Sequence, residues 1–429
     1  MKNEFAGKKL LILGGNPETS ALVKLANSMG ILTIVTSARK KDDAKQYSWK
    51  SYDIDGMDVS KIVEMAKKEE VDGVLVGVAD ILVPSYCKVC KELNLPCYAT
   101  QEIVDVFSYK DTFKETCERY GIHGIPQFKL DADMKPEDVE KIKYPVMVKP
   151  VDNGGGVGMT VVYNESELAP AVKKALDASN KKRFLVERYM LCEDMGMYYT
   201  FKDGDCSPSC IYDRYTSNEQ PGLARVCLGG TYPSKHLKEY FEKMHENAVK
   251  MFRDIGIKNG VLMLTGFFED GEFYIYDTGF RLQGEAPHFL IRAVQGFDQR
   301  EMLIRFALTG SEGDFDLLRV DDPTFRGKWG ATLWFLIKEG TVARIEGLED
   351  VNRDPRVVSN GQRIFEGMQV PKEWIGNEKQ VLTRMHLLCE TKEELRDVLK
   401  EYMCKVKVTD MDGNSMLLKG FDVEKALGL

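Results

Sequence analysis

Short apolar segments alternate with amphipathic ones through the first hundred residues. KLLILGG, LTIVTS and DGVLVGV are each short and rich in apolar side chains, as buried strands are. Residues 19–29, the segment IVEMAKKEE and the segment after Asp80 instead read as amphipathic helices. This alternation predicts a parallel sheet whose strands are joined by helical crossovers.

The pattern changes at residue 108. A charged helix is expected over SYKDTFKETCERYGI, which leads through IPQF to strands over YPVMVKP, MTVVY and RFLVERYM, with a helix at 165–178 before the last strand. VLMLTGFF and EFYIYDTGF flank the turn EDGE and predict a hairpin. Beyond about residue 310 the chain mixes strand and helix patterns, with a final helix at TKEELRDVLKEYM. The predicted fold class is α/β combined with α+β.

The turn after the first strand, LGGNPETS, has glycines between a strand and a helix. It lacks the GxGxxG spacing of a dinucleotide fold, so a nicotinamide cofactor is not expected. In doubly wound sheets, ligands lie beyond the carboxyl ends of the strands. Gly14, Gly15 and Asp80 are therefore candidate neighbours of a small substrate, and tight turns with a helix cap explain them equally well.

Composition and charge restrict the class of protein. The chain has 429 residues, a net charge of −8 and no basic block, which argues against nucleic-acid and anionic-membrane partners. No apolar run reaches the roughly 20 residues that a membrane helix needs. Ten cysteines without a secretory signal fit a reducing cytoplasm. Cys87 and Cys90 have CxxC spacing on a helical pattern without a second ligand pair, which favours a structural role.

The segment VMVKPVDNGGGVGMTVV carries the first chemical signal. A strand ends at Lys149, and a loop with glycines at 154, 155, 156 and 158 follows it. Gly154, Gly155, Gly156 and Gly158 would let backbone amides approach phosphate oxygens, and the lysine adds a point charge. No lysine–serine pair follows the last glycine, so this is not a Walker loop. A flexible hairpin turn is the alternative interpretation.

The order of motifs adds to this signal. Lys110 lies near the start of the helix SYKDTFKE, and LVERYM follows the glycines about 30 residues later. This order resembles the ATP-grasp superfamily, in particular the branch of biotin carboxylase, carbamoyl-phosphate synthase large chain and D-alanine–D-alanine ligase. The resemblance implies a pre-ATP-grasp domain at 1–107, an ATP-grasp domain at 108–310 whose residues 144–190 bear the lid, and a C-terminal domain at 311–429.

The resemblance assigns roles to the phosphate-binding and nucleoside-binding positions. Lys110 and Lys149 match the two lysines that reach the phosphates, and the glycine loop matches the lid. The segment ERYM matches the hinge that reads the adenine edge, with Glu187 facing the nucleotide and Tyr189 and Met190 following it. An acid seven places beyond that glutamate often holds the ribose hydroxyls in the family.

Two acids compete for the ribose position in this chain. The seventh place after the hinge glutamate is Asp194, and Glu193 lies beside it. The spacing favours Asp194, and the neighbouring carboxylate keeps the alternative open.

The metal-binding positions match only in part. Family members carry an acid or glutamine on one strand and an acid-x-asparagine-x-arginine series twelve residues later. Here these places hold Thr265, Asp277, Gly279 and Arg281. Period-two alternation puts the last three on one face, and a three-residue loop at 270–272 would set the threonine opposite the aspartate. One carboxylate with ATP would bind magnesium more weakly, and Glu285 is a candidate replacement.

Other polar residues near this series are candidates for the acceptor side. His288 and Arg292 would face the acceptor substrate, although a lone histidine is more often structural. Residues 212–236, with Arg214 and Arg225, have loop composition and are a candidate for acceptor specificity.

The resemblance implies an ATP-dependent ligase that uses Mg²⁺ and joins a carboxylate to an amine through an acyl phosphate, releasing ADP and phosphate. Arg281 and Lys149 are its expected catalytic residues, and a surface ion pair is the alternative for Arg281. The implied partners are small-molecule substrates, with a homodimer possible. A bicarbonate-using enzyme is the second hypothesis, although the chain has no biotinyl-acceptor motif. An ATP-binding protein with degraded catalysis is the third.

Overall fold

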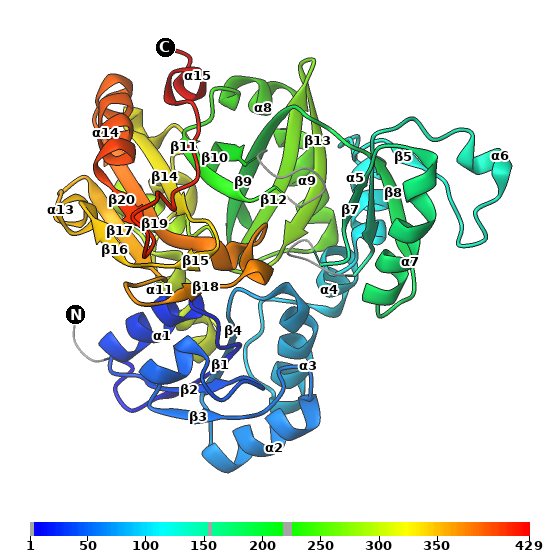
Figure 1. The fold of residues 1–429 in the computed structure, drawn as a ribbon. Helices are drawn as coiled ribbons and strands as arrows, with labels where there is room; N and C mark the ends of the chain where they lie inside the picture. Colours follow the sequence, from blue (N-terminus) through cyan, green and yellow to red (C-terminus); the bar gives the residue numbers. More distant parts are fainter. Residues whose placement is uncertain (1–3, 153–156, 218–224) are drawn as a thin grey trace.

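Three sheets organise the molecule (Figure 1). The computed structural model describes residues 4–152, 157–217 and 225–429. Its mixture of a parallel sheet, a small antiparallel sheet and a large antiparallel sheet confirms the predicted fold class. Among the helices of the described ranges, none is long and apolar enough to cross a membrane. The cytoplasmic location stays a prediction.

The N-terminal sheet is parallel, in the order β3-β2-β1-β4, and lies at the bottom of Figure 1. Its elements are β1 (Lys9–Leu13), α1 (Thr19–Ser28), β2 (Leu32–Thr36), β3 (Lys50–Tyr52), α2 (Val59–Glu69), β4 (Gly73–Val76), a short 3₁₀ turn (Asp80–Leu82) and α3 (Val83–Leu93). The alternation of strand and helix is as predicted. The short edge strand β3 was not predicted, because its residues are mostly exposed and have no apolar pattern.

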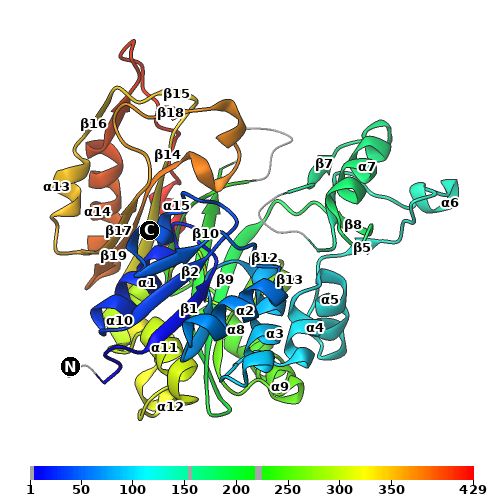
Figure 2. The same cartoon turned by 90° about the horizontal axis from the view of Figure 1, so that it is seen from below.

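The small sheet projects to the right in Figure 1 and stands apart from the large sheet in Figure 2. It is antiparallel, in the order β5-β8-β6-β7. Its elements are β5 (Gln127–Phe128), α6 (Pro136–Val139), β6 (Val146–Pro150), β7 (Thr160–Val162), α7 (Leu168–Ala178) and β8 (Phe184–Arg188). Helix α7 covers the sheet, and its apolar face joins the sheet in one core. Two helices connect this sheet to the N-terminal one, α4 (Gln101–Phe107) and α5 (Lys110–Arg119).

The large sheet has eight antiparallel strands in the order β13-β12-β9-β10-β11-β14-β19-β17. They are β9 (Glu193–Lys202), β10 (Asp205–Thr216), β11 (Cys227–Tyr232), β12 (Gly260–Glu269), β13 (Glu272–Gly279), β14 (Trp329–Leu336), β17 (Val357–Gln362) and β19 (Val381–Cys389). The last three continue the sheet beyond residue 310. The division of the chain at residues 107 and 310 stays a prediction.

The expectation of a loop over residues 212–236 is wrong where two strands lie within it, at residues 212–216 and 227–232. Strand β10 runs to Thr216 and β11 begins at Cys227. Arg214, one of the charged residues that suggested a loop, lies on β10 and is paired there, because it donates hydrogen bonds to Asp194 of β9 and to Glu285. Polar residues with such partners do not prevent a buried strand.

Helices and short strands complete the fold. The helices are α8 (Leu237–Lys243), α9 (His245–Ile255), α10 (His288–Gln295), α11 (Gln299–Thr309), α12 (Leu317–Val320), α13 (Leu348–Asn352), α14 (Lys392–Lys405) and α15 (Val423–Leu427). The short strands are β15 (Gly340–Thr341), β16 (Arg344–Glu346), β18 (Gln369–Val370) and β20 (Lys407–Thr409). The helix predicted at the end is α14, and it is not the last, because α15 follows it.

The β12–β13 hairpin reaches the predicted register by a different route. Thr265 lies opposite Asp277, as expected. The loop, however, has two residues, Asp270 and Gly271, both with positive φ, as a type I′ turn requires. An irregularity beside Tyr276 adds one residue to β13 and restores the pairing. The predicted three-residue loop is therefore wrong, although the pairing that it implied is correct.

Phe280, just after β13, fixes the end of this hairpin in the core. Its ring is 2% exposed and packs against Tyr98, Phe107 and Phe201, with ring centroids 5.3, 6.1 and 6.3 Å away. These partners come from three different parts of the chain. The ring therefore ties the stretch between Asp277 and Arg281 to the N-terminal and connecting elements.

We expect Phe280→Ala to lower the free energy of unfolding by about 3–5 kcal/mol, because it removes a buried aromatic ring and leaves a cavity. Denaturant titration followed by intrinsic fluorescence measures this loss. Phe365→Ala is the matched control, since that ring is 52% exposed, and its effect should stay within about 0.5 kcal/mol. Equal effects for the two variants would contradict the role of Phe280 in the core.

Candidate functional site

A cleft of about 660 Å³ opens where the three sheets meet. The small sheet and the start of α5 line one side, and strands β9 to β13 line the other. The loop after β4 and residues 376–378 close the remaining side. Most of the residues predicted for the site line this cleft, namely Lys110, Lys149, Glu187, Tyr189, Met190, Asp194, Thr265, Asp277 and Arg281.

Lys110 enters the cleft from the first turn of α5. Its Nζ lies 2.6 Å from Oδ1 of Asp277, which is 167 residues away in the chain. Burial alone would lower the pKa of Lys110, but the charge and hydrogen bond of Asp277 outweigh it and raise that pKa. The same pair lowers the pKa of Asp277 against the effect of burial. Both groups are therefore charged at neutral pH.

Lys149 enters from β6, and its side chain is almost fully buried. Its Nζ lies 2.6 Å from Oε2 of Glu187 on the neighbouring strand β8. Lys114 lies 3.3 Å from the other oxygen of the same carboxylate. Burial lowers the pKa of Lys114 more than the charge of Glu187 raises it. Sequence reasoning did not single out Lys114, although its spacing of four residues from Lys110 puts both on one face of α5.

The glycine loop is described only at its end. Gly154, Gly155 and Gly156 lie outside the described residues. Gly158 has a φ of +76°, and a Cβ there would lie 2.5 Å from the Cβ of Ala178 in α7. This glycine thus permits close packing of the loop end on the helix that covers the small sheet.

One end of the cleft is apolar. Ile125, Met190 and Phe267 form a small buried cluster there, at the point where β8 leaves the small sheet. The guanidinium of Arg225 lies 5.8 Å from the centre of the Tyr189 ring and 5.6 Å from that of Phe267. A flat apolar base fits such a surface.

Asp194 lies beside this apolar end, at the start of β9. Its carboxylate accepts hydrogen bonds from Arg214 at 2.9 Å and Tyr276 at 3.2 Å. Burial raises the pKa of Asp194, and Arg214 offsets only part of this effect. Glu193 instead pairs with Lys235, 2.7 Å away, and does not line the cleft. Of the two acids that the sequence left open, only Asp194 borders the cleft.

Side-chain oxygen atoms on β12 and β13 are suitable ligands for a hard cation. The carboxylate of Asp277 is one-third exposed, and Thr265 faces it on the neighbouring strand. Magnesium takes one or two carboxylates together with phosphate oxygens and water, so Asp277 suits it. Glu285 is less available, because Arg214 binds one of its oxygens at 2.6 Å and Tyr212 donates to the other at 2.8 Å.

Arg281 follows β13 and lies in the same cleft, with its side chain buried. It pairs with Asp80, which comes from the loop after β4. Burial alone would lower the pKa of Arg281, and Asp80 raises it. Asp80 was singled out at the end of a predicted strand, and it borders the cleft; Gly14 and Gly15 do not.

His288 and Arg292 were expected to face the acceptor, and the structure places neither of them in the cleft. His288 is buried on α10, and burial holds the pKa of its ring well below the usual value. Arg292 is exposed and pairs with Asp298 at 3.5 Å.

A second charged group borders the cleft and was not predicted. Glu18, from the loop before α1, pairs with Arg363 and, at 3.1 Å, with Arg384 of β19. Arg384 also pairs with Glu378 at 2.7 Å and lies 3.8 Å from the centre of the Trp334 ring. No local pattern marks these residues, because the group forms only when distant segments meet.

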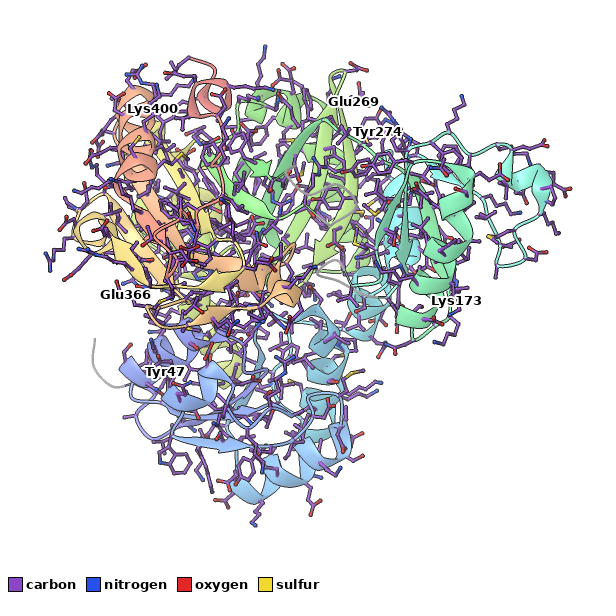
Figure 3. All side chains as sticks on the ribbon, viewed as in Figure 1. Tyr47, Lys173, Glu269, Tyr274, Glu366 and Lys400 are labelled. Carbon is purple, nitrogen blue, oxygen red and sulfur yellow. The ribbon has the colours of Figure 1, made fainter. Side chains whose placement is uncertain are left out.

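One ion pair bridges the small and large sheets at the exposed edge of the hairpin. Arg188 of β8 binds Glu269 of β12, with a closest distance of 2.9 Å. In Figure 3, Glu269 and Tyr274 lie near the turn of the β12–β13 hairpin. The same figure labels Lys173 on α7 and Lys400 on α14. The ring of Tyr274 lies 6.2 Å from that of His123, just before the small sheet. These contacts join the two walls of the cleft at this edge.

The chain resembles known proteins over the same residues. Residues 109–311 match the family model described as the carbamoyl-phosphate synthase L chain, ATP binding domain. The carbamoyl phosphate synthase large chain of Clostridium beijerinckii is 23% identical over 299 residues, which are 66% of this chain and 27% of that protein. The formate-dependent phosphoribosylglycinamide formyltransferase of Sulfurisphaera tokodaii is 24% identical over 257 residues, covering 58% and 64%. The chain thus spans about a quarter of the length of the carbamoyl phosphate synthases that it matches.

Solved structures share the fold over nearly the whole chain. The L-amino acid ligase from Bacillus licheniformis superposes with a TM-score of 0.77 at 17% identity, covering 95% of this chain and 99% of that one. The biotin carboxylase domain of Hydrogenobacter thermophilus 2-oxoglutarate carboxylase, solved with MgADP and bicarbonate, has a TM-score of 0.74 at 16% identity, covering 95% and 91%. The family match, over just under half of the chain, places residues 109–311 in the ATP-grasp superfamily, and the solved structures show that the fold is shared over nearly the whole chain.

Proposed function

We propose that the protein is an ATP-dependent ligase that joins a small-molecule carboxylate to an amine, using Mg²⁺ and releasing ADP and phosphate. One observation carries the proposal: Lys110 and Lys149 come from different elements, and their ammonium groups line one cleft next to an apolar pocket. A triphosphate needs concentrated positive charge, and a purine needs a flat apolar surface. The cleft offers both.

The residues of the cleft divide the chemistry among them. Lys110 and Lys149 bind phosphate oxygens, and Arg281 neutralises the charge that develops as the substrate carboxylate attacks the γ-phosphate. Asp277, with Thr265 beside it, would hold Mg²⁺, which would supply further positive charge for the phosphates when bound. ADP leaves as the acyl phosphate forms; the amine then attacks the acyl carbon, forms the C–N bond with loss of a proton, and displaces inorganic phosphate. Enclosure by the small sheet keeps water from hydrolysing the intermediate.

The nucleoside is assigned to the apolar end of the cleft. We propose that the segment from Glu187 to Met190 borders the adenine and that Asp194 binds the ribose hydroxyls. Asp194 is buried beside the apolar cluster and already accepts hydrogen bonds, as a hydroxyl-binding carboxylate would. The glycine loop, Gly154 to Gly156 together with Gly158, is proposed to cover the phosphates. A homodimer is proposed as well, since the biotin carboxylase domain of the 2-oxoglutarate carboxylase was solved as a dimer.

Phosphate release in the presence of Mg²⁺ tests the ligase directly. The protein is incubated with ATP and a library of amino acids and other carboxylates, alone and in pairs. Release that requires one carboxylate and one amine is the expected result, because the carboxylate forms the acyl phosphate and the amine then displaces phosphate from it. Release with bicarbonate alone would instead favour a carboxylase, and tight ATP binding without any release would favour a nucleotide-binding protein.

We expect Lys149→Ala to lower the rate of phosphate release at least about 100-fold, because it removes a preorganised charge from the phosphates. The fold should persist, since Lys114 still pairs with Glu187 at 3.3 Å. Lys143→Ala, at an exposed position shortly before β6, is the matched control and should keep the wild-type rate. Retained turnover in Lys149→Ala with an unchanged melting temperature would remove this residue from the mechanism.

Asp194→Asn should weaken the binding of ADP more than that of 2′-deoxy-ADP, because the carboxylate accepts from the ribose hydroxyls and 2′-deoxy-ADP lacks one of them. The expected loss for ADP is about tenfold, as for one charged hydrogen bond. Isothermal titration of both nucleotides measures it. Glu193→Gln is the matched control, and a loss of discrimination in that variant rather than in Asp194→Asn would reverse the assignment.

A further inference from the structure

Asp80 lies where a side chain at position 279 would lie. Gly279, at the end of β13, has no Cβ, and an ideal Cβ there would be 2.4 Å from Oδ1 of Asp80. Gly279 does not have a positive φ, so its backbone also suits other residues. The absent side chain therefore makes room for a carboxylate that arrives from the N-terminal sheet.

The two oxygens of this carboxylate have different surroundings. Oδ2 of Asp80 accepts a hydrogen bond from Nη2 of Arg281, whereas Oδ1 has no hydrogen-bond donor among the described residues. The side chain is 47% exposed, and it borders the cleft. Nε of Arg281 is buried and likewise lacks a partner within the described part of the chain. One carboxylate oxygen and one guanidinium N–H thus remain available beside Gly279.

Asp80 and Asp277 lie around the same cations. Residues 277 and 279 share one face of β13, because side chains alternate along a strand. Asp277 pairs with Lys110 at 2.6 Å, and Asp80 pairs with Arg281 and has its Oδ1 2.4 Å from the place of a Cβ at Gly279, between the two. The carboxylates of Asp80 and Asp277 therefore lie around one small volume, beside the last residues of β13.

We propose that Asp80 supplies, from the N-terminal sheet, a second carboxylate for the Mg²⁺ that accompanies the nucleotide, beside Asp277 on β13. This inference rests on the proposed function, since it assigns a ligand to the same site. Two carboxylates with phosphate oxygens and water make up a coordination shell that Mg²⁺ prefers. The carboxylate of Asp80 lies where a side chain of residue 279 would lie, and it serves as the metal ligand that glycine cannot provide.

The charge balance of the cleft favours this arrangement. Without nucleotide, Asp277 neutralises Lys110 and Asp80 neutralises Arg281. Phosphate oxygens attract Lys110 and Arg281. Asp277 and Asp80 then lose the positive charge that neutralised them. A divalent cation between the carboxylates and the phosphates supplies it.

The other carboxylates of the cleft are less suited to this role. Both oxygens of Glu285 accept hydrogen bonds, from Arg214 and from Tyr212. Glu18 is bound by two arginines of the C-terminal region. Strand β4, which precedes Asp80, packs closely on α11, because a Cβ at Gly73 would be 2.4 Å from the carbonyl oxygen of Ala307.

The test compares nucleotide binding with and without metal. Isothermal titration of a non-hydrolysable ATP analogue is carried out in Mg²⁺ and in EDTA, for the wild type and for Asp80→Asn, which keeps an acceptor for Arg281. We expect Asp80→Asn to lose at least about tenfold of the gain in affinity that Mg²⁺ gives, with little change in EDTA. Glu18→Gln removes one charge from the same cleft and should keep the full gain.

A carboxylate exchange provides the second arm. The double variant Asp80→Ala, Gly279→Asp moves the carboxylate onto β13 at the same net charge, and we expect it to regain the Mg²⁺ effect. Mn²⁺ binding with the analogue, followed by electron paramagnetic resonance, should give one bound ion in the wild type and in the double variant, and weaker binding in Asp80→Asn.

Each other outcome has a distinct meaning. An unchanged Mg²⁺ gain in Asp80→Asn would overturn the assignment of Asp80 and leave the ligase proposal standing. Equal losses in Asp80→Asn and Glu18→Gln would also overturn it, since the effect would then be that of general charge. If the analogue binds to none of these proteins, the ligase proposal fails together with this inference.

Discussion

Buried positive charge needs a partner, and this requirement organises the cleft. Lys110 and Lys149 are held by Asp277 and Glu187, and Arg281 is held by Asp80. An unpaired buried charge is costly, so each cation keeps a carboxylate beside it until an anion arrives. The site is thus preorganised for a polyanion, and binding exchanges partners rather than burying new bare charge. The proposed use of metal follows from the same exchange, because the released carboxylates then require a cation.

The pairs also tie distant parts of the chain together. Lys110 and Asp277 are 167 residues apart, and Asp80 and Arg281 are 201 residues apart. The ring of Phe280 lies between these two contacts in the chain and packs into the core shared by the N-terminal and central elements. A shift of the N-terminal sheet would therefore move Asp80 relative to β13. Stability of the fold and geometry of the site depend on the same contacts.

Local pattern predicted much of this structure and missed what depends on distant partners. The apolar strands and amphipathic helices of the first hundred residues, and the β12–β13 pairing, follow from periodicity. Strands β9 to β11 were not predicted, because charged residues such as Asp213 and Arg214 in this region are paired with residues from other segments. For the site, the order of motifs indicated that Lys110, Lys149 and Asp277 lie close together, and all three line one cleft. It gave no indication that Asp80 would fill the space beside Gly279, since that contact exists only after the sheets pack.

The central claim is that both lysines bind the phosphates of one nucleotide. A crystal structure with Mg²⁺ and a non-hydrolysable ATP analogue tests it most directly. We expect Nζ of Lys110 and of Lys149 to lie within about 3.2 Å of phosphate oxygens. The base should lie against the apolar cluster of Ile125, Met190 and Phe267. A nucleotide bound elsewhere, or one in this cleft with both lysines still paired only to their carboxylates, would contradict it.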